Sequence, residues 1–276
     1  DGIRDHCVTG VQTCALPICE PSGITPYVTI GILVLNVLVS IAQYADPGML
    51  LMEGGLRPAW FLGYLNGETM GTIPEVERKD AQALELLFDG RFAPPTEMPL
   101  TFATAILPLL LSMFLHGGLM HLIGNMLFLW IFSDNIEGRL GHVRFLIFYL
   151  LCGVIASLTH VVLNPESITP TVGASGAIAG ILGAYWLCYP HSKVTLLFWI
   201  YVIIRTFEIR ASWFLGFWFA RDIFRVWVGL EGSTAVWAHI GGFVIGTCLI
   251  IPFTPPGHSN REVRFRWLER SGLIRK

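Results

Sequence analysis

The chain of 276 residues is 53% hydrophobic and only 14% charged, and its mean hydropathy is +0.60. Soluble domains carry about 25% charged residues, so the composition excludes an ordinary soluble protein and indicates an integral membrane protein. The net charge of −2 excludes the basic footprint of a nucleic-acid-binding protein. We therefore expect one membrane domain built from apolar helices of about 20 residues.

The first twenty residues differ in character from the rest of the chain. Their cysteines, Cys7, Cys14 and Cys19, have spacings that fit no common zinc pattern. The stretch 8–18 resembles a translated sequencing adaptor, so residues 1–20 are predicted to be a non-native or disordered segment. The sequence predicts neither a metal site nor a cofactor.

Six apolar segments are predicted to form transmembrane helices, which makes the expected fold an all-α, six-helix membrane bundle. They span residues 27–44, 119–132, 143–163, 175–189, 211–227 and 236–252. Residues 45–98 are acidic and predict a solvated outer loop, with a short amphipathic helix at 80–89. Residues 100–115, broken by Pro108, and residues 194–204 are predicted to be interfacial or re-entrant pieces.

Basic residues predict how the membrane domain, residues 21–260, is oriented. Arg139, Lys193 and the basic tail at 261–276 belong on the cytoplasmic side by the positive-inside rule. With six spans, both termini are then cytoplasmic, and we expect a location in a bacterial plasma membrane. The same orientation places the start of the fourth span near the outer face.

Ser175 is the candidate nucleophile, because it lies between Gly173 and Gly176 at the start of an apolar helix. A helix N-terminus offers free N–H groups and a partial positive charge, which suit a developing oxyanion. Gly-x-Ser-Gly is also a packing motif of membrane helices. The serine therefore needs a base and oxyanion donors from elsewhere in the chain.

His239 lies early in the sixth span, at a depth similar to that of Ser175, and is the candidate base. A small-xxx-small pair on each helix predicts close packing: Gly176 with Gly180, and Gly242 with Gly246. A neutral imidazole in such a seam can take the serine proton and return it to a leaving amine. No carboxylate is predicted to complete a triad.

His121 and Asn125 lie one helical turn apart at the mouth of the second span, so they share one face. They are candidate oxyanion donors. A metal site and a capping network are the rival interpretations, but His116 and His121 are five residues apart, where zinc binding by one helix face needs four. His116 is assigned a structural role.

Together these motifs resemble the rhomboid family of intramembrane serine proteases, over residues 99–250. The resemblance implies a Ser175–His239 dyad, an oxyanion site with His121 and Asn125, and cleavage of single-span membrane proteins near the outer face. It also implies structural roles for Glu137 and Arg139. One departure is Ala179, where many relatives carry an aromatic residue. The motifs are His116…His121-Leu-x-x-Asn125-Met126, Glu137-x-Arg139-x-Gly141, Gly173-x-Ser175-Gly176 and Ala238-His239-x-x-Gly242-x-x-x-Gly246.

Two other functional classes remain open at this point. A catalytically inactive relative that binds membrane clients would be favoured by the absence of Ser175 or His239, and both are present. A transporter would line a path through the bilayer with polar groups, whereas the polar residues here gather at one depth. The expected partners are transmembrane substrates and membrane lipid; the sequence leaves the oligomeric state open.

Overall fold

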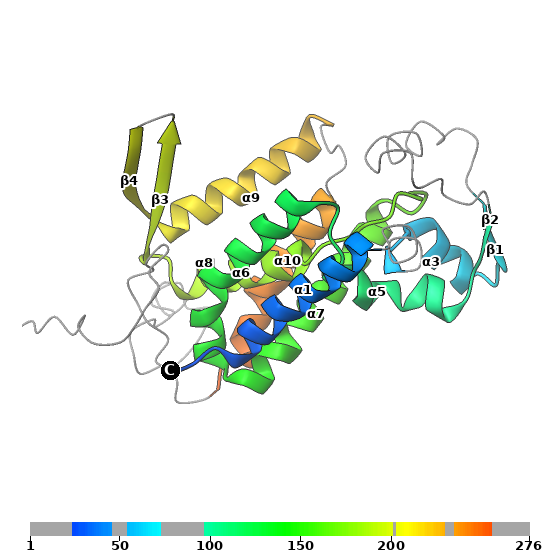
Figure 1. Cartoon of the computed structure of the whole chain (residues 1–276), viewed down its shortest axis with the longest axis horizontal. Coiled ribbons are helices and arrows are strands. Elements are labelled where there is room, and N and C mark those ends of the chain that lie inside the picture. Colours follow the sequence, from blue (N-terminus) through cyan, green and yellow to red (C-terminus); the bar gives the residue numbers. More distant parts are fainter. Residues whose placement is uncertain (1–23, 46–53, 73–96, 201–202, 230–234, 256–276) are drawn as a thin grey trace, which may run out of the picture.

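The structure is a computed structural model that describes residues 24–45, 54–72, 97–200, 203–229 and 235–255. The predictions made for residues 1–20, 80–89 and 261–276 lie outside these ranges. Among the described residues, six helices have fourteen residues or more (Figure 1). They are α1 (Tyr27–Ala45), α6 (Leu119–Leu140), α7 (His142–Leu163), α8 (Ser175–Cys188), α9 (Ala211–Trp227) and α10 (Val236–Phe253).

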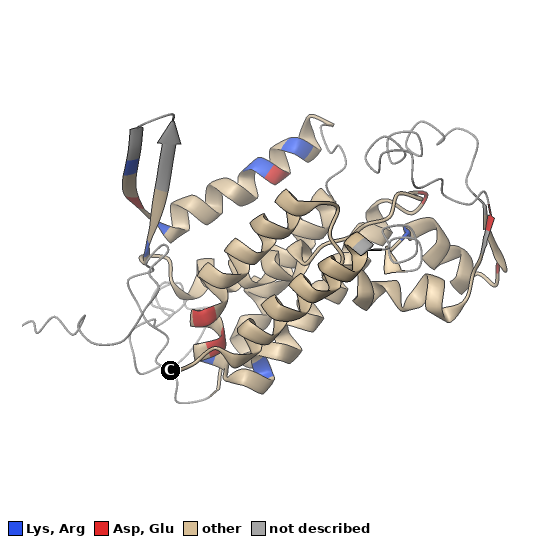
Figure 2. Cartoon of the chain, viewed as in Figure 1, with Lys and Arg blue, Asp and Glu red and all other residues tan. Residues whose placement is uncertain are grey.

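The predicted helical membrane bundle is confirmed. Helices α1, α6, α7 and α10 are long and apolar enough to cross a membrane. Helix α8 is equally apolar but has only fourteen residues, and it lies in the middle of the bundle against α6, α7 and α10. Among the described residues, the charged ones gather near the helix ends and on α9, and the ribbon in the middle of the bundle carries none (Figure 2). This distribution is what a hydrocarbon environment requires.

Two antiparallel hairpins add strands to the expected all-helical fold. The segment predicted to be interfacial or re-entrant is instead β3 (Lys193–Ile200), which pairs with β4 (Ile203–Arg210) from Lys193↔Arg210 to Ile200↔Ile203. Its sequence is rich in β-branched and aromatic residues, which favour strands over helices. A smaller hairpin pairs β1 (Met70–Thr72) with β2 (Glu97–Pro99).

Helix α6 is longer than the predicted span of 119–132, because the polar residues that follow continue the helix to Leu140. Within it, the carboxylate of Glu137 finds its partners inside the protein. The buried Glu137 carboxylate accepts hydrogen bonds from Val28 N at 2.9 Å, from Thr29 N at 2.8 Å and from Thr29 Oγ1 at 2.6 Å. Glu137 thereby caps the first turn of α1. Gly141, with φ of 77°, ends α6 and lets α7 begin at once.

Short helices cover the end of the bundle at which α8 begins. They are α3 (Pro58–Leu65), η2 (Phe102–Ile106), α5 (Pro108–Leu111) and η3 (Ser112–Phe114), so the segment 100–115 is broken at Pro108 as predicted. Leu56 and Thr171 exchange two backbone hydrogen bonds of 3.1 and 2.7 Å. This bridge fastens the segment before α3 to the loop that leads into Ser175.

Candidate active site

The site lies on a seam between α8 and α10, whose backbones touch. A Cβ added at Gly246 would overlap the carbonyl oxygen of Gly180, and one added at Gly242 would overlap that of Gly176. Only glycine permits this approach. The two small-xxx-small pairs singled out in the sequence therefore face each other in the structure.

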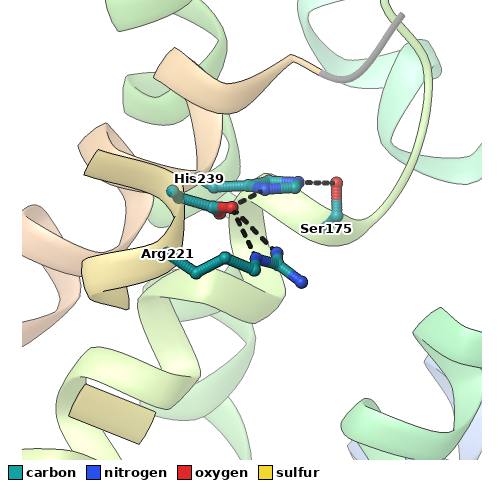
Figure 3. Close-up of polar contacts among 4 residues, drawn as sticks. Ser175, Arg221 and His239 are labelled. Atoms are coloured by element: carbon teal, nitrogen blue, oxygen red, sulfur yellow. Dashed lines mark hydrogen bonds and ion pairs between the residues drawn. The ribbon is translucent and has the colours of Figure 1, made fainter. Parts of the chain in front are cut away.

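Ser175 and His239 meet at the end of this seam, as the matched depths of their helices predict. Ser175 Oγ lies 2.9 Å from His239 Nε2 (Figure 3). Ser175 is the first residue of α8 and is half-buried, and His239 stands in the first turn of α10 with 7% of its surface exposed. This is the hydrogen-bond reach that a nucleophile and its base require.

A carboxylate also reaches the histidine, so the expectation of none is wrong. Asp222 Oδ2 of α9 lies 3.0 Å from His239 Nδ1, and Asp222 is completely buried. Its other oxygen, Oδ1, accepts hydrogen bonds from Arg221 Nε at 3.1 Å and Arg221 Nη2 at 2.8 Å (Figure 3). The Ser175, His239 and Asp222 side chains thus form a continuous hydrogen-bonded row.

The aromatic neighbour of His239 also comes from α9. Ala179 is completely buried on α8 and offers only a methyl group at the position where many relatives carry an aromatic residue. Trp218 instead lies beside the imidazole, with ring centroids 5.4 Å apart and planes inclined by 35°. Sequence analysis missed both Trp218 and Asp222. Their spacing with Leu215, three and four residues apart, is the signal of a shared helical face.

His121 and Asn125 both lie against Gly173, two residues before Ser175. A Cβ added at Gly173 would lie 2.8 Å from His121 Nε2 and 3.5 Å from Asn125 Nδ2. Gly117 N donates to His121 Nδ1 over 3.4 Å, which leaves the ring proton on Nε2, the nitrogen that faces Gly173. Asn125 Nδ2 is buried and has no hydrogen-bond partner within the described part of the chain. Two side-chain donors therefore converge on Gly173, two residues before the serine.

The start of α8 adds backbone donors to the same place. No side chain from the described part of the chain caps this helix, and its first residue is Ser175 itself. The backbone N–H groups of the first turn are therefore free to bind a negative charge. Gly173, with φ of 126°, supplies the backbone turn that brings the chain into the helix.

His116 is held in the loop before α6, and its ring lies next to the ring of His121, which belongs to this donor set. Gln43 of α1 exchanges two hydrogen bonds with the His116 backbone, of 2.6 and 3.0 Å. Burial lowers the pKa of His116 to about 4. The ring therefore stays neutral near pH 7, and the contacts fit a structural role. Within the described ranges, no group of three or more His, Cys, Asp or Glu side chains is arranged to hold a metal ion.

Comparison with known proteins agrees with this geometry. The family model described as Rhomboid domain matches residues 103–256, which is more than half of the chain. The chain belongs to the rhomboid family. The matched region contains Ser175, His239, Asp222 and the whole α8–α10 seam.

Curated relatives of this rhomboid come from animals and plants. It is 30% identical over 174 residues to presenilin-associated rhomboid-like protein A, mitochondrial, of Danio rerio, and 33% identical over 170 residues to the Homo sapiens presenilin-associated rhomboid-like protein, mitochondrial. It is 30% identical over 148 residues to RHOMBOID-like protein 6, mitochondrial, of Arabidopsis thaliana. These matches cover 62%, 61% and 51% of this chain, but only 42%, 41% and 41% of the relatives.

The relatives correct the prediction of location. They are named as mitochondrial proteins of eukaryotes, which contradicts a bacterial plasma membrane with both termini in the cytoplasm. The positive-inside rule gives an orientation relative to a membrane, but it does not identify which membrane that is. The integral membrane character of this rhomboid stands, because four of its helices are long and apolar enough to span a bilayer.

Proposed function

We propose that this rhomboid is an intramembrane serine endopeptidase that cleaves single-span membrane proteins. The observation that carries the proposal is the 2.9 Å contact between Ser175 Oγ and His239 Nε2. Glycine alone would be enough to pack the two backbones together. A serine and a histidine in contact at the end of this seam therefore indicate a chemical role and not only helix packing. The family match supports the same assignment.

The reaction follows from the positions of the two side chains. His239 Nε2 accepts the hydroxyl proton while Ser175 Oγ attacks the scissile carbonyl carbon, which gives a tetrahedral oxyanion. The imidazolium then gives its proton to the leaving amine, and the C–N bond breaks to leave an acyl-serine. Water then attacks the ester while the same imidazole takes its proton. When the C–O bond to Ser175 breaks, the imidazolium returns that proton to Ser175 Oγ, and the new carboxyl end is released.

The oxyanion is stabilised by donors that already point to one place. These are the backbone N–H groups at the start of α8, His121 Nε2–H and the unpartnered Asn125 Nδ2. Fixed donors cost no reorganisation when charge develops, and each is worth roughly 10²–10³-fold in rate. A buried amide nitrogen without a partner is expensive unless a ligand satisfies it, which supports a role for Asn125 in the reaction.

The substrate class follows from the place of the nucleophile. Ser175 begins its helix, beside the exposed His121, so a cleaved bond must come to the membrane surface on that side. A peptide bond within a transmembrane helix is hydrogen-bonded and shielded, and serine reaches it only if the helix unwinds. Substrates are therefore segments with glycine, proline or other helix-weakening residues near that end, and with small residues at the cleaved bond.

Membrane proteins are the partners that this activity requires. The human and Danio rerio relatives are named presenilin-associated, which supports recognition of membrane-embedded partners by this rhomboid. Lipid surrounds the exposed apolar side chains of α1, such as Leu38 and Ile41. These are inferences from the domain alone, because the chain covers about two fifths of those relatives.

Cleavage of a reconstituted single-span substrate tests the proposal. The full chain is compared with Ser175→Ala and His239→Ala in liposomes, and circular dichroism establishes that each variant keeps its helical content. We expect the wild type to cleave and both variants to lose cleavage without losing their fold. Near-normal turnover by either variant would contradict the dyad. A folded wild type that binds the substrate but never cleaves it would favour the inactive client-binding class.

Changes in the substrate helix test whether it must unwind before cleavage. A poly-leucine segment replaces the transmembrane helix of a cleaved substrate, and a Gly-Ala pair is then restored at one end or the other. We expect rescue only by the pair at the end that lies level with Ser175. Equal cleavage of the poly-leucine and restored substrates would rule out a need for unwinding.

A further inference from the structure

We propose that Asp222 is a positioning residue for the base: it holds His239 in the tautomer and orientation that activate Ser175. The inference rests on the proposed protease function and deepens it. It turns a two-residue catalytic group into a row of three whose last member is supplied by a different helix, α9.

The charge state of Asp222 fixes the direction of the hydrogen bonds. Its Oδ1 accepts two hydrogen bonds from the Arg221 guanidinium, which remains protonated in proteins, so the carboxylate is ionised and only accepts. His239 Nδ1 must therefore carry the proton that it donates to Oδ2. Nε2 is then the free acceptor, and it faces the hydroxyl of Ser175. This is the tautomer that a general base needs.

Because the row is buried, the Asp222 carboxylate strongly stabilises a positive charge on the His239 imidazole. Asp222 is completely buried, and 9% of the His239 side chain is exposed. A proton that arrives on the imidazole during attack creates a cation in a poorly solvated place, where Coulomb interactions are stronger than in water. A fixed carboxylate at 3.0 Å stabilises that cation. Asp222 itself keeps its charge throughout and exchanges no proton.

The rest of α9 is arranged to present Asp222 to the site. Leu215, Trp218 and Asp222 recur three and four residues apart and lie on one helical face. Leu215 is completely buried and Trp218 packs beside the His239 ring. The opposite face carries strongly exposed apolar side chains, Trp213 and Phe217, both 74% exposed. The single buried acid of α9 is therefore on the face that meets the base.

A purely structural interpretation treats the pair as a staple that fastens α9 to α10. It predicts that loss of the carboxylate loosens α9 but leaves the ring proton of His239 and the split between kcat and KM unchanged. The positioning role predicts that loss of the carboxylate shifts the ring proton of His239 and lowers kcat much more than it changes KM. Measurements of the His239 ring proton, kcat and KM therefore distinguish the two interpretations, because a change in stability alone does not alter the position of the proton or the split between kcat and KM.

The test measures the His239 tautomer and the kinetics in the same full-length variants. The chain is labelled with ¹⁵N-histidine in nanodiscs, and His239→Gln identifies the His239 resonances by their loss. Nitrogen shifts then report which ring nitrogen carries the proton. The variants are Asp222→Asn, which keeps the shape and removes the charge, and Asp222→Glu, which keeps the charge. Glu208→Gln is the matched control, since Glu208 is an exposed carboxylate that pairs with Lys193 on the β3–β4 hairpin.

In the wild type and in Glu208→Gln we expect the proton on Nδ1. In Asp222→Asn we expect it to move wholly or partly to Nε2, with kcat for a single-span substrate lowered about 10²–10⁴-fold and KM changed less than about threefold. Asp222→Glu should recover at least about tenfold of that loss. An unchanged tautomer together with an unchanged kcat in Asp222→Asn would overturn the positioning role.

The two readouts also separate this inference from the proposed function. If the wild type cleaves no substrate and yet the Asn variant shifts the His239 proton, the protease assignment fails and the orienting contact stands. If the wild type cleaves and Asp222→Asn cleaves as fast with the same tautomer, the protease function stands and Asp222 only fastens α9 to α10.

Discussion

The α8–α10 seam and helix α9 contribute to one site in opposite ways. Twelve of the fourteen residues of α8 are buried, and its glycines bring it into backbone contact with α10. In α9, the buried residues number three of seventeen: Ala211, Leu215 and Asp222. The seam positions Ser175 and His239 through the main chain, whereas α9 acts on His239 through two side chains, Trp218 and Asp222.

The two kinds of contact differ in how well they tolerate substitutions. Backbone contacts between two helices leave no rotamers to adjust, so a single added methyl group must separate the helices. Helix α9 is sparsely buried, so substitutions on its exposed face are tolerated. The contact with His239 is lost only when the contacting side chain itself is altered. Substitutions in the seam should therefore affect folding and activity together, and substitutions on α9 should affect activity alone.

The largest effect is expected in the seam. Gly246→Ala places a methyl group against the carbonyl oxygen of Gly180, so α10 must move away and carry His239 with it. We expect a loss of about 1–3 kcal/mol or more in unfolding free energy and the loss of cleavage, measured by denaturant unfolding in detergent and by substrate turnover. Gly31→Ala is the control, because nothing lies within 4 Å of a Cβ at Gly31. A fully active and equally stable Gly246→Ala protein would show that the backbones are not locked.

A smaller effect is expected at the mouth of the seam, where side chains rather than backbones provide the chemistry. Asn125→Ala should lower kcat by roughly 10–10³-fold with a smaller change in KM, because the amide acts mainly on the transition state. Steady-state kinetics on a single-span substrate measure both constants. An unchanged kcat would assign Asn125 to packing alone.

The smallest effect is expected from the apolar contact of α9. Trp218→Ala removes the ring beside His239 and should lower kcat by about 3–10-fold, in the range of about 1 kcal/mol that an aromatic contact contributes. Phe217→Ala is its matched control, since Phe217 is the adjacent residue and is 74% exposed. Equal rates for the two variants in the same cleavage assay would remove Trp218 from the account of how His239 is positioned.

Much of the seam could be predicted from the sequence. The glycine pairs, the serine at the start of an apolar helix and the histidine at matching depth are local patterns with a direct physical meaning. The bounds of α1, α7, α8 and α10 fall within one residue of the predicted spans. The predicted second span ends at residue 132 because the polar stretch after it is typical of a turn, whereas Glu137 in that stretch is buried by the N-terminus of α1, more than a hundred residues away in sequence.

The contribution of α9 was missed for a different reason. Arg221, Asp222 and Arg225 place three charges in one apolar segment, and only the spacing of Asp222 with Leu215 and Trp218 indicates a shared helical face. Which side of α9 meets α10 depends on tertiary docking, and no local pattern encodes the partner. The β3–β4 hairpin was missed because a short apolar run has no period that distinguishes a strand from an interfacial helix.

The central claim, that His239 activates Ser175 as a nucleophile, is tested most directly by covalent labelling. The full chain in detergent is treated with a fluorophosphonate, which phosphonylates activated serines, and the labelled peptide is identified by mass spectrometry. The account predicts one adduct, on Ser175, with labelling lost in His239→Ala although that variant remains folded. An adduct on another serine, or equal labelling of Ser175 with and without His239, would contradict it.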